Sequence, residues 1–443
     1  MSSNTSPTST NIFKSDSFCV HPWTNLMVNN PGTYGFCCIA WRAHLQDEDN
    51  NTILASNTMP DDAWNAKSLR EVRKDMVKGK KLDVCEKCWY QERTGKDSYR
   101  QRHNREWSER LGAKEIERRV IETENNDGYL STPPDFLDLR LGNLCNLKCR
   151  MCNVFNSNQI EKEHHTLRKN NRYVDMWSKQ WPLTSPDSGP IPMEWVEAPE
   201  FWNQLNGYIP DLKKVYFTGG EPTLLKSTYE FMQEMVDQGV QDKVDLMFNT
   251  NCTNAQPRFL DMLSKFKSVQ IQASIDGTEL VNDYIRAPSH WETIKKNFIA
   301  LGELPNVKLN ISPAVQIFNV LNLTEIVEFA DEVSRKQNRI IDVDFLYVKH
   351  PTYLDVPNLA EHIRDVAFTY LQKAQNLWLY KNSEITKNSV DAYLNILEGE
   401  RDKNWKQNLQ DFWDMTDMLD KSRKQKFENY IPLLWNLMKD ELI

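Results

Sequence analysis

The sequence predicts an α/β protein with a partial (β/α)6 barrel of the TIM type over residues 135–350. Two observations predict this fold. Strand-like apolar runs alternate with amphipathic segments of helical periodicity, which is typical of parallel β units. Polar and glycine-containing motifs follow several of these runs, and barrels place their chemistry at the carboxyl ends of strands. The six predicted strands are Phe136–Leu141, Lys214–Thr218, Val244–Asn249, Val269–Ile275, Val307–Val315 and Ile341–Val348.

The remaining sequence is expected to form appendages to this barrel, because 443 residues exceed one ordinary domain. The segment that begins near Asn170 and ends near Glu200, rich in Trp, Pro and Ser, reads as a long loop that could act as a lid. Residues Leu419–Leu442 have apolar positions at helical spacing, which favours packing rather than a cofactor site. We expect a disordered tail over 1–17, a cysteine-rich domain over 18–105, a charged helical linker over 106–134, the barrel, and a helical region over 351–443.

Composition and charge narrow the class of protein. The net charge is −8, so nucleic acid is not an expected partner. No apolar run approaches membrane-spanning length, and the polar N-terminus lacks the apolar core of a signal peptide. Nine cysteines without an export signal predict a reducing, cytoplasmic location, where thiols serve metals or catalysis.

The most informative motif is the run Cys145-Asn-Leu-Lys-Cys149-Arg-Met-Cys152, which directly follows the first predicted strand. Three closely spaced thiolates can bind three irons of a [4Fe–4S] cluster and leave the fourth iron without a protein ligand. An iron without a protein ligand can take part in a reaction, whereas a fourth cysteine would fill that position and leave the cluster mainly to electron transfer. The competing interpretation is a zinc knot or chance clustering, but zinc sites need four ligands and no fourth lies nearby.

A second motif, Gly219-Gly220-Glu221-Pro222, follows the second predicted strand. Glycines let the backbone approach a ligand closely, and the carboxylate can accept hydrogen bonds from an ammonium group. With both motifs in this order, the sequence resembles the radical S-adenosylmethionine (radical SAM) superfamily. One departure is Met151, since many members carry an aromatic residue just before the third cysteine.

The resemblance implies a set of cofactor-binding residues. The three cysteines would bind the catalytic cluster, SAM would chelate the open iron, and the Gly-Gly-Glu turn would hold the amino group of SAM. Asn249 and Asn251 match an element that lines the SAM pocket, Ser274 and Asp276 match a fourth-strand element, and Arg286 matches a residue that meets the SAM carboxylate. Asn319 resembles a further pocket asparagine, and the segment Phe345–Val348 would flank the adenine.

Cysteines near the N-terminus form a second group. Cys19, Cys37 with its neighbour Cys38, and the pair Cys85 and Cys88 lie in a region that looks like a β-hairpin followed by a helix, with Gly32 in the turn. The pattern resembles the auxiliary-cluster extension called SPASM, in its shorter form Twitch. This resemblance implies a second [4Fe–4S] cluster held by Cys19, Cys37, Cys85 and Cys88. The extension usually follows the barrel, whereas here it precedes it; a four-cysteine zinc site and Cys38 in place of Cys37 stay open as alternatives.

The implied activity is reductive cleavage of SAM to a 5′-deoxyadenosyl radical, which abstracts hydrogen from a C–H bond of the substrate. A flavodoxin or ferredoxin would supply the electron. The substrate class favoured by the resemblance is a peptide or protein; the alternative is a small molecule, such as a sugar or nucleotide, that is oxidised or epimerised. A non-catalytic iron–sulfur scaffold is a third hypothesis. Cys252 stands where the family usually has glycine, and it is either a hydrogen-atom donor or a small buried apolar residue.

Overall fold

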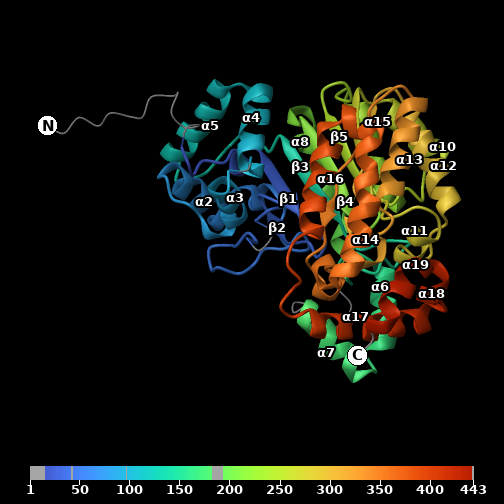
Figure 1. Ribbon diagram of the computed structural model, residues 1–443. Coiled ribbons are helices and arrows are strands. Elements are labelled where there is room, and N and C mark those ends of the chain that lie inside the picture. Colours follow the sequence, from blue (N-terminus) through green and yellow to red (C-terminus); the bar gives the residue numbers. More distant parts are fainter. Residues whose placement is uncertain (1–14, 41–42, 96, 182–192, 442–443) are drawn as a thin grey trace. The chain divides into compact units, whose positions relative to one another are not determined.

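The computed structural model describes residues 15–40, 43–95, 97–181 and 193–441. The chain divides into two compact units, which are described one at a time (Figure 1). The first unit comprises Met1–Gly142, Pro192–Gly219 and Ser227–Asp245. The second comprises Asn143–Ile191, Gly220–Lys226 and Leu246–Ile443. Both are mixed α/β, and their strands pair mostly in parallel.

The first unit is built on four strands in the order β2-β1-β3-β4. The predicted hairpin is present, because β1 (Asn25–Val28) and β2 (Tyr34–Gly35) pair antiparallel across a turn that contains Gly32. β1 also pairs in parallel with β3 (Phe136–Leu141), and β3 pairs in parallel with β4 (Lys214–Gly219). The N-terminal segment therefore contributes a strand to the same sheet as the first predicted barrel strand, which the sequence did not indicate.

Helices flank this sheet. The charged stretch from Glu106 to Glu124 is helical, as expected. It belongs to two helices, because Gly112 adopts a φ of +79° that ends one and begins the next. Ser98 starts the first of them with a reciprocal capping box to Gln101. The helices of this unit are α1 (Pro60–Trp64), α2 (Lys67–Val77), α3 (Glu86–Arg93), α4 (Tyr99–Leu111), α5 (Ala113–Asn125), α8 (Pro199–Tyr208) and most of α9 (Lys226–Asp237).

The second unit carries the strands β5 (Asp245–Thr250), β6 (Ser268–Ala273), β7 (Val307–Ile311) and β9 (Asp342–Val343), adjacent in that order. The predicted strand Val307–Val315 is shorter than expected because Pro313 interrupts it. Its second half, β8 (Ala314–Val315), pairs with β10 (Leu346–Tyr347), which is the second half of the predicted strand Ile341–Val348. Both of the last two predicted strands are therefore split.

The core of this unit lies between its strands and the amphipathic helices that follow them. Val307, Leu309 and Ile311 are almost completely buried on one face of β7. On α13 (Leu323–Lys336), which contacts β9, Ile326, Val327 and Ala330 recur at helical spacing and are fully buried. The helices between the strands are α10 (Pro257–Ser264), α11 (Glu279–Ile285), α12 (Trp291–Gly302) and α13 (Leu323–Lys336).

The C-terminal region is helical, as expected, but its last segment is not one helix. The chain leaves α17 (Trp405–Arg423) through Lys424, which has a φ of +56°, and Pro432 begins a new helix. Leu442 lies outside the described residues.

The insertion that was expected to be a loop contains helix α7 (Asn171–Gln180), which lies beside α17 (Figure 1). Residues 182–192 of the insertion lie outside the described residues. The elements are α6 (Asn158–Leu167), α7 (Asn171–Gln180), α14 (Glu361–Gln372), α15 (Trp378–Asn382), α16 (Glu384–Leu397), α17 (Trp405–Arg423), α18 (Phe427–Tyr430) and α19 (Pro432–Met438).

Within the described ranges, no helix has both the length and the apolar character that a bilayer crossing requires. Residues 1–14 of the predicted tail are outside these ranges. Ser17, the last residue of that tail, is buried, and its hydroxyl donates to the carbonyl of Met76 at 3.3 Å.

Candidate functional site

The three-cysteine motif forms a loop that precedes α6 and is fixed by backbone hydrogen bonds. The amide of Lys148 donates to the carbonyl of Ala287 at 2.6 Å, and the amide of Arg150 donates to that of Ile285 at 2.9 Å. The amide of Cys145 donates to the side-chain oxygen of Asn158 at 3.2 Å. Because the backbone is bonded outward to neighbouring elements, the loop keeps one conformation without using its thiols.

The thiols of Cys145, Cys149 and Cys152 lie near enough to interact electrostatically. Burial, followed by the neighbouring Cys149, raises the pKa of Cys145 to about 12. Burial and the other two thiols also raise the pKa of Cys152. Three thiols in these surroundings lose their protons together only where a cation balances the charge, so the donor set fits an iron–sulfur cluster with one cysteine on each of three irons.

The Gly-Gly-Glu turn lies directly against the beginning of the cysteine loop. A Cβ atom on Gly220 would come within 2.3 Å of the carbonyl oxygen of Leu144, so a side chain does not fit there. The amide of Glu221 donates to that same carbonyl oxygen at 2.8 Å. Gly219, the last residue of β4, belongs to the other unit. The turn therefore sets the distance between Glu221 and the cysteines.

The Glu221 carboxylate is almost completely buried and accepts several hydrogen bonds. Oε1 accepts from the hydroxyls of Thr223 at 2.7 Å and Thr250 at 2.8 Å, and more weakly from the Thr223 amide at 3.3 Å. Oε2 accepts from the amide of Asn251 at 2.7 Å. Burial raises the pKa of Glu221 and these bonds oppose the rise. An ionised carboxylate has about four acceptor positions, so Oε2 can still accept from an ammonium group.

Asn251 directly follows β5 and lies beside this carboxylate, and Asn249 is the last but one residue of that strand. Asn251 donates from its side chain to that of Asn146 in the cysteine loop at 2.9 Å. The side-chain oxygen of Asn249 is buried and has no hydrogen-bond partner among the described residues. A buried oxygen without a partner is costly unless a ligand or water supplies the donor. This orphaned acceptor fits a cosubstrate site at the end of β5.

Arg286 and Asp276 form a buried pair next to Cys149. Nε of Arg286 lies 2.7 Å from Oδ2 of Asp276, and its Nη1 lies 3.7 Å from the sulfur of Cys149. Burial works against the charge of Arg286, but the Asp276 carboxylate together with Cys149 and Cys152 outweighs it, and the arginine pKa is raised. Oδ1 of Asp276 accepts from the amide of Ala314 at 2.7 Å. Asp276 therefore orients the cation beside the cysteine loop.

The other predicted pocket residues occupy more structural positions. Ser274 donates its amide to the carbonyl of Thr250 at 2.8 Å. Asn319 is fully buried, and its side-chain amide donates to the carbonyl of Asp276 at 2.8 Å. Cys252 is also fully buried and has a φ of +58°, which explains why glycine suits this position. Its thiol lies 3.9 Å from the carbonyl oxygen of Thr250, and its role as a hydrogen donor stays a prediction.

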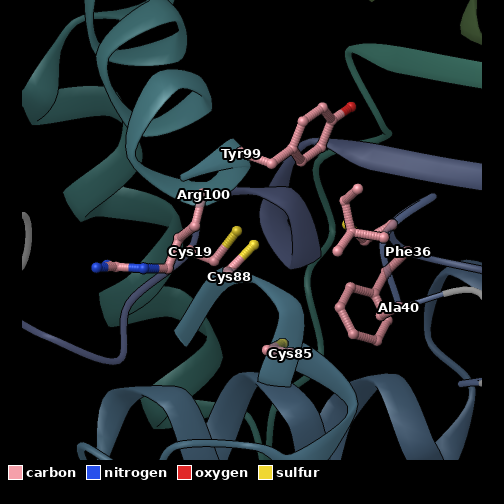
Figure 2. A pocket seen from close by; sticks show the side chains of 9 residues that line it. Cys19, Phe36, Ala40, Cys85, Cys88, Tyr99 and Arg100 are labelled. Atoms are coloured by element: carbon pink, nitrogen blue, oxygen red, sulfur yellow. The ribbon is translucent and has the colours of Figure 1, made fainter. Parts of the chain in front are cut away.

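The N-terminal cysteines lie together around a pocket in the first unit. Cys19, Cys37, Cys85 and Cys88 line it, with Phe36, Ile39, Ala40, Tyr99 and Arg100. Figure 2 shows the sulfurs of Cys19 and Cys88 side by side, with Cys85 at the start of α3. Burial raises the pKa of Cys85 to about 12, while the Arg100 charge opposes the rise.

Cys38 does not line this pocket, and it differs chemically from Cys37. A hydrogen bond from Cys37 is the largest cause that lowers the pKa of Cys38 to about 7, and a hydrogen bond from the Tyr99 hydroxyl adds to it. The same Cys37–Cys38 bond raises the pKa of Cys37. Within the described part of the chain, no three His, Cys, Asp or Glu side chains are arranged to hold a single metal ion.

Several residues that hold the site were not singled out from the sequence. Asn146 bonds to Asn251, and Asn158 accepts from Cys145. The sequence feature that could have indicated these residues is the high number of asparagines in and around the cysteine motif, at positions 143, 146, 153, 156 and 158. Asparagine offers both a donor and an acceptor, which suits irregular backbone. Glu163 and Arg423 also hold the loop, but no local pattern indicates them.

The family comparison agrees with the motifs. Residues 139–333 match the family model described as the Radical SAM superfamily. This segment of the chain is therefore similar to radical SAM domains. This match covers the cysteine loop, the Gly-Gly-Glu turn and the ends of β5, β6 and β7. None of the curated proteins compared with the sequence matches it.

Among solved structures, the chain is similar to Streptococcus suis SuiB. For SuiB bound to S-adenosylmethionine, the TM-score is 0.37 at 14% identity, over 73% of this chain and 66% of that chain. For SuiB bound to precursor peptide SuiA, the TM-score is 0.36 at 14% identity, with the same coverage. A further SuiB structure gives 0.36 at 13% identity, over 70% of this chain and 62% of that one. The chain thus spans less than two thirds of these proteins.

Proposed function

We propose that this protein is a radical SAM enzyme, with SAM and a [4Fe–4S] cluster bound at the three-cysteine loop. The observation that carries the proposal is the contact between the loop and the Gly-Gly-Glu turn, in which Glu221 is bonded to the Leu144 carbonyl just before Cys145. The match of residues 139–333 to the radical SAM family model supports it independently. When bound, the cluster supplies one electron that cleaves SAM to a 5′-deoxyadenosyl radical.

Each part of the proposed site has a task that follows from its chemistry. Cys145, Cys149 and Cys152 would hold the cluster. Oε2 of Glu221 and the orphaned oxygen of Asn249 can accept hydrogen bonds from the ammonium and hydroxyl groups of SAM. Arg286 offers a cation to the SAM carboxylate, and its pairing with Asp276 fixes the direction of the guanidinium. Burial of these groups strengthens each interaction because little water screens it.

We further propose that the pocket of the first unit holds an auxiliary [4Fe–4S] cluster on Cys19, Cys37, Cys85 and Cys88. The four thiols line one pocket, and Arg100 supplies a buried positive charge that favours thiolates. Cys37 lines this pocket and Cys38 does not, which favours Cys37 as the ligand. A zinc ion is the alternative occupant. A flavodoxin or ferredoxin is the proposed reductant for both centres.

The substrate we propose is a peptide or protein, as the resemblance to Twitch-type proteins implies. A sugar or nucleotide that undergoes oxidation or epimerisation is the alternative. Candidate substrates can be separated by adding each to the reduced enzyme and measuring deuterium transfer from labelled substrate into 5′-deoxyadenosine. Label from a peptide, with none from sugars or nucleotides, supports the first class.

The proposed activity is tested by anaerobic incubation of the reconstituted protein with dithionite and SAM. We expect 5′-deoxyadenosine and methionine in equal amounts, and no product above background for Cys149→Ala. The matched control is Cys252→Ala, which removes a buried thiol outside the cysteine loop and should keep SAM cleavage. Reconstituted wild type with a full cluster but no 5′-deoxyadenosine would favour the non-catalytic scaffold.

A further inference from the structure

Helix α17 is tied to the cysteine loop on both sides of Cys149. Lys148 precedes this cysteine, and its Nζ lies 3.2 Å from Oε1 of Glu163 on α6. Arg150 follows it, and its Nη2 lies 2.5 Å from Oδ1 of Asp420 on α17. The two flanking cations therefore fix the position of the middle cysteine. The contact between Arg150 and Asp420 links residues 270 positions apart in the chain.

The Arg150 contact is deeply buried. Only 1% of its side chain is exposed, and its guanidinium carbon lies 3.6 Å from the centre of the Tyr284 ring. Nε donates to the carbonyl of Tyr284 at 3.1 Å, while the Tyr284 hydroxyl donates to Asp420 at 2.9 Å. Oδ2 of Asp420 accepts from the amide of Phe427 at 2.8 Å. Asp420 thus joins the cysteine loop, α11 and the start of α18.

On the other side of the loop, Arg423 and Glu163 form a second buried pair, with 4% and 5% of their side chains exposed. Nη2 of Arg423 lies 2.6 Å from Oε2 of Glu163, and Nε lies 3.1 Å from Oε1. The Ser422 hydroxyl adds a third bond to the carboxylate at 3.1 Å. A two-pronged contact of this kind fixes direction as well as distance. Glu163 in turn holds Lys148.

We propose that α17 supports the proposed cluster site: Asp420 and Arg423 are positioning residues that hold the three-cysteine loop. The inference rests on the proposed function for the identity of that site, whereas the hold on the loop concerns the protein without its cluster. Neither residue touches SAM in this assignment. Both act through the loop.

The test measures hydrogen–deuterium exchange of the apoprotein over residues 145–152. Asp420→Asn and Arg423→Gln should each speed exchange of this segment at least fivefold. The matched control is Asp414→Asn, since Asp414 lies on the same helix but pairs with Arg172 on α7 at 2.7 Å. Equal exchange in Asp420→Asn and Asp414→Asn would overturn the proposal. This result does not depend on whether the protein binds a cluster or SAM.

Arg423→Lys keeps a cation that can pair with Glu163 and should restore most of the slow exchange of residues 145–152. Exchange in Arg423→Lys as fast as in Arg423→Gln would overturn the role of this pair. Failure of the proposed function would instead appear as a wild-type protein whose reconstituted cluster gives no signal that responds to SAM.

Discussion

Gly220 is the residue of the site where a side chain has least room. A Cβ atom would lie 2.3 Å from the oxygen and 2.7 Å from the carbon of the Leu144 carbonyl, and both are backbone atoms that cannot rotate away. The turn must therefore move if any other residue is placed there. Since Glu221 is bonded to the same carbonyl, a shift at position 220 would also displace the carboxylate.

Gly220→Ala should weaken SAM binding at least tenfold and reduce the iron retained by the cysteine loop. The expected loss of stability is about 1–3 kcal/mol, typical of overpacking. Gly207→Ala is the control, because Gly207 lies in α8 with open space around its Cα and should be neutral or more stable by up to about 1 kcal/mol. Thermal unfolding and SAM-binding titrations check both variants. Unchanged SAM affinity in Gly220→Ala would contradict the role of the turn.

Glu221→Gln tests the carboxylate itself. An amide cannot accept on both of its polar atoms, so at least one of the bonds from Thr223, Thr250 or Asn251 is lost. A buried donor left without its partner costs about 1–3 kcal/mol. We expect a lower unfolding temperature and SAM affinity that falls about tenfold or more. Glu292→Gln, an exposed acid in the first turn of α12, should change stability by only a few tenths of a kcal/mol and leave affinity intact.

At the scale of single elements, α4 is the helix that positions Cys19. The side chain of Asn104 accepts from the amide of Val20 at 2.8 Å and donates to the carbonyl of Phe18 at 3.0 Å. Arg100 donates to the same Phe18 carbonyl at 2.7 Å. The backbone on both sides of Cys19 is therefore bonded to one helix. This arrangement keeps the Cys19 thiol in the lining of the pocket that Figure 2 shows.

Asn104→Ala should cost about 2 kcal/mol, because two buried hydrogen bonds are lost and the Val20 amide is left unpaired, while Arg100 still donates to the Phe18 carbonyl. Iron bound at the auxiliary site should fall, while SAM cleavage at the three-cysteine loop should persist in part. Arg105→Ala is the control on the same helix: its pair with Asp97 is exposed and is worth about 0–1 kcal/mol. Chemical unfolding and iron analysis check the difference. Equal iron loss in both variants would contradict the role of Asn104.

The bounds of the strands show what local sequence can and cannot predict. The strand Phe136–Leu141 was predicted with its observed bounds, and Lys214–Thr218 to within one residue, since both are apolar and end in recognisable motifs. The last two strands were predicted too long because Pro313 and the chain at 344–345 interrupt them. Apolar periodicity does not report such breaks when both halves remain apolar.

At the scale of the whole molecule, the two proposed metal sites lie in different compact units. The three-cysteine loop, Glu221 and Arg286 belong to the second unit, and the N-terminal cysteines belong to the first. Short spacing made the three-cysteine motif and the pair Cys85 and Cys88 visible in the sequence, whereas Cys19 and Cys37 were assigned only by the resemblance to the Twitch pattern. The ion pairs that join Arg150 to Asp420 and Glu163 to Arg423 were not visible there, because each depends on a contact between distant segments that only the fold creates.

The central claim is that the three-cysteine cluster has an iron open to SAM. The most direct measurement is electron paramagnetic resonance of the dithionite-reduced, reconstituted protein with and without SAM, in a Cys85→Ala/Cys88→Ala background that removes two ligands of the second site. The account predicts a [4Fe–4S]+ signal that SAM changes, and its loss in Cys145→Ala/Cys149→Ala/Cys152→Ala. A protein that holds only zinc, or an iron signal that SAM leaves unchanged, would contradict it.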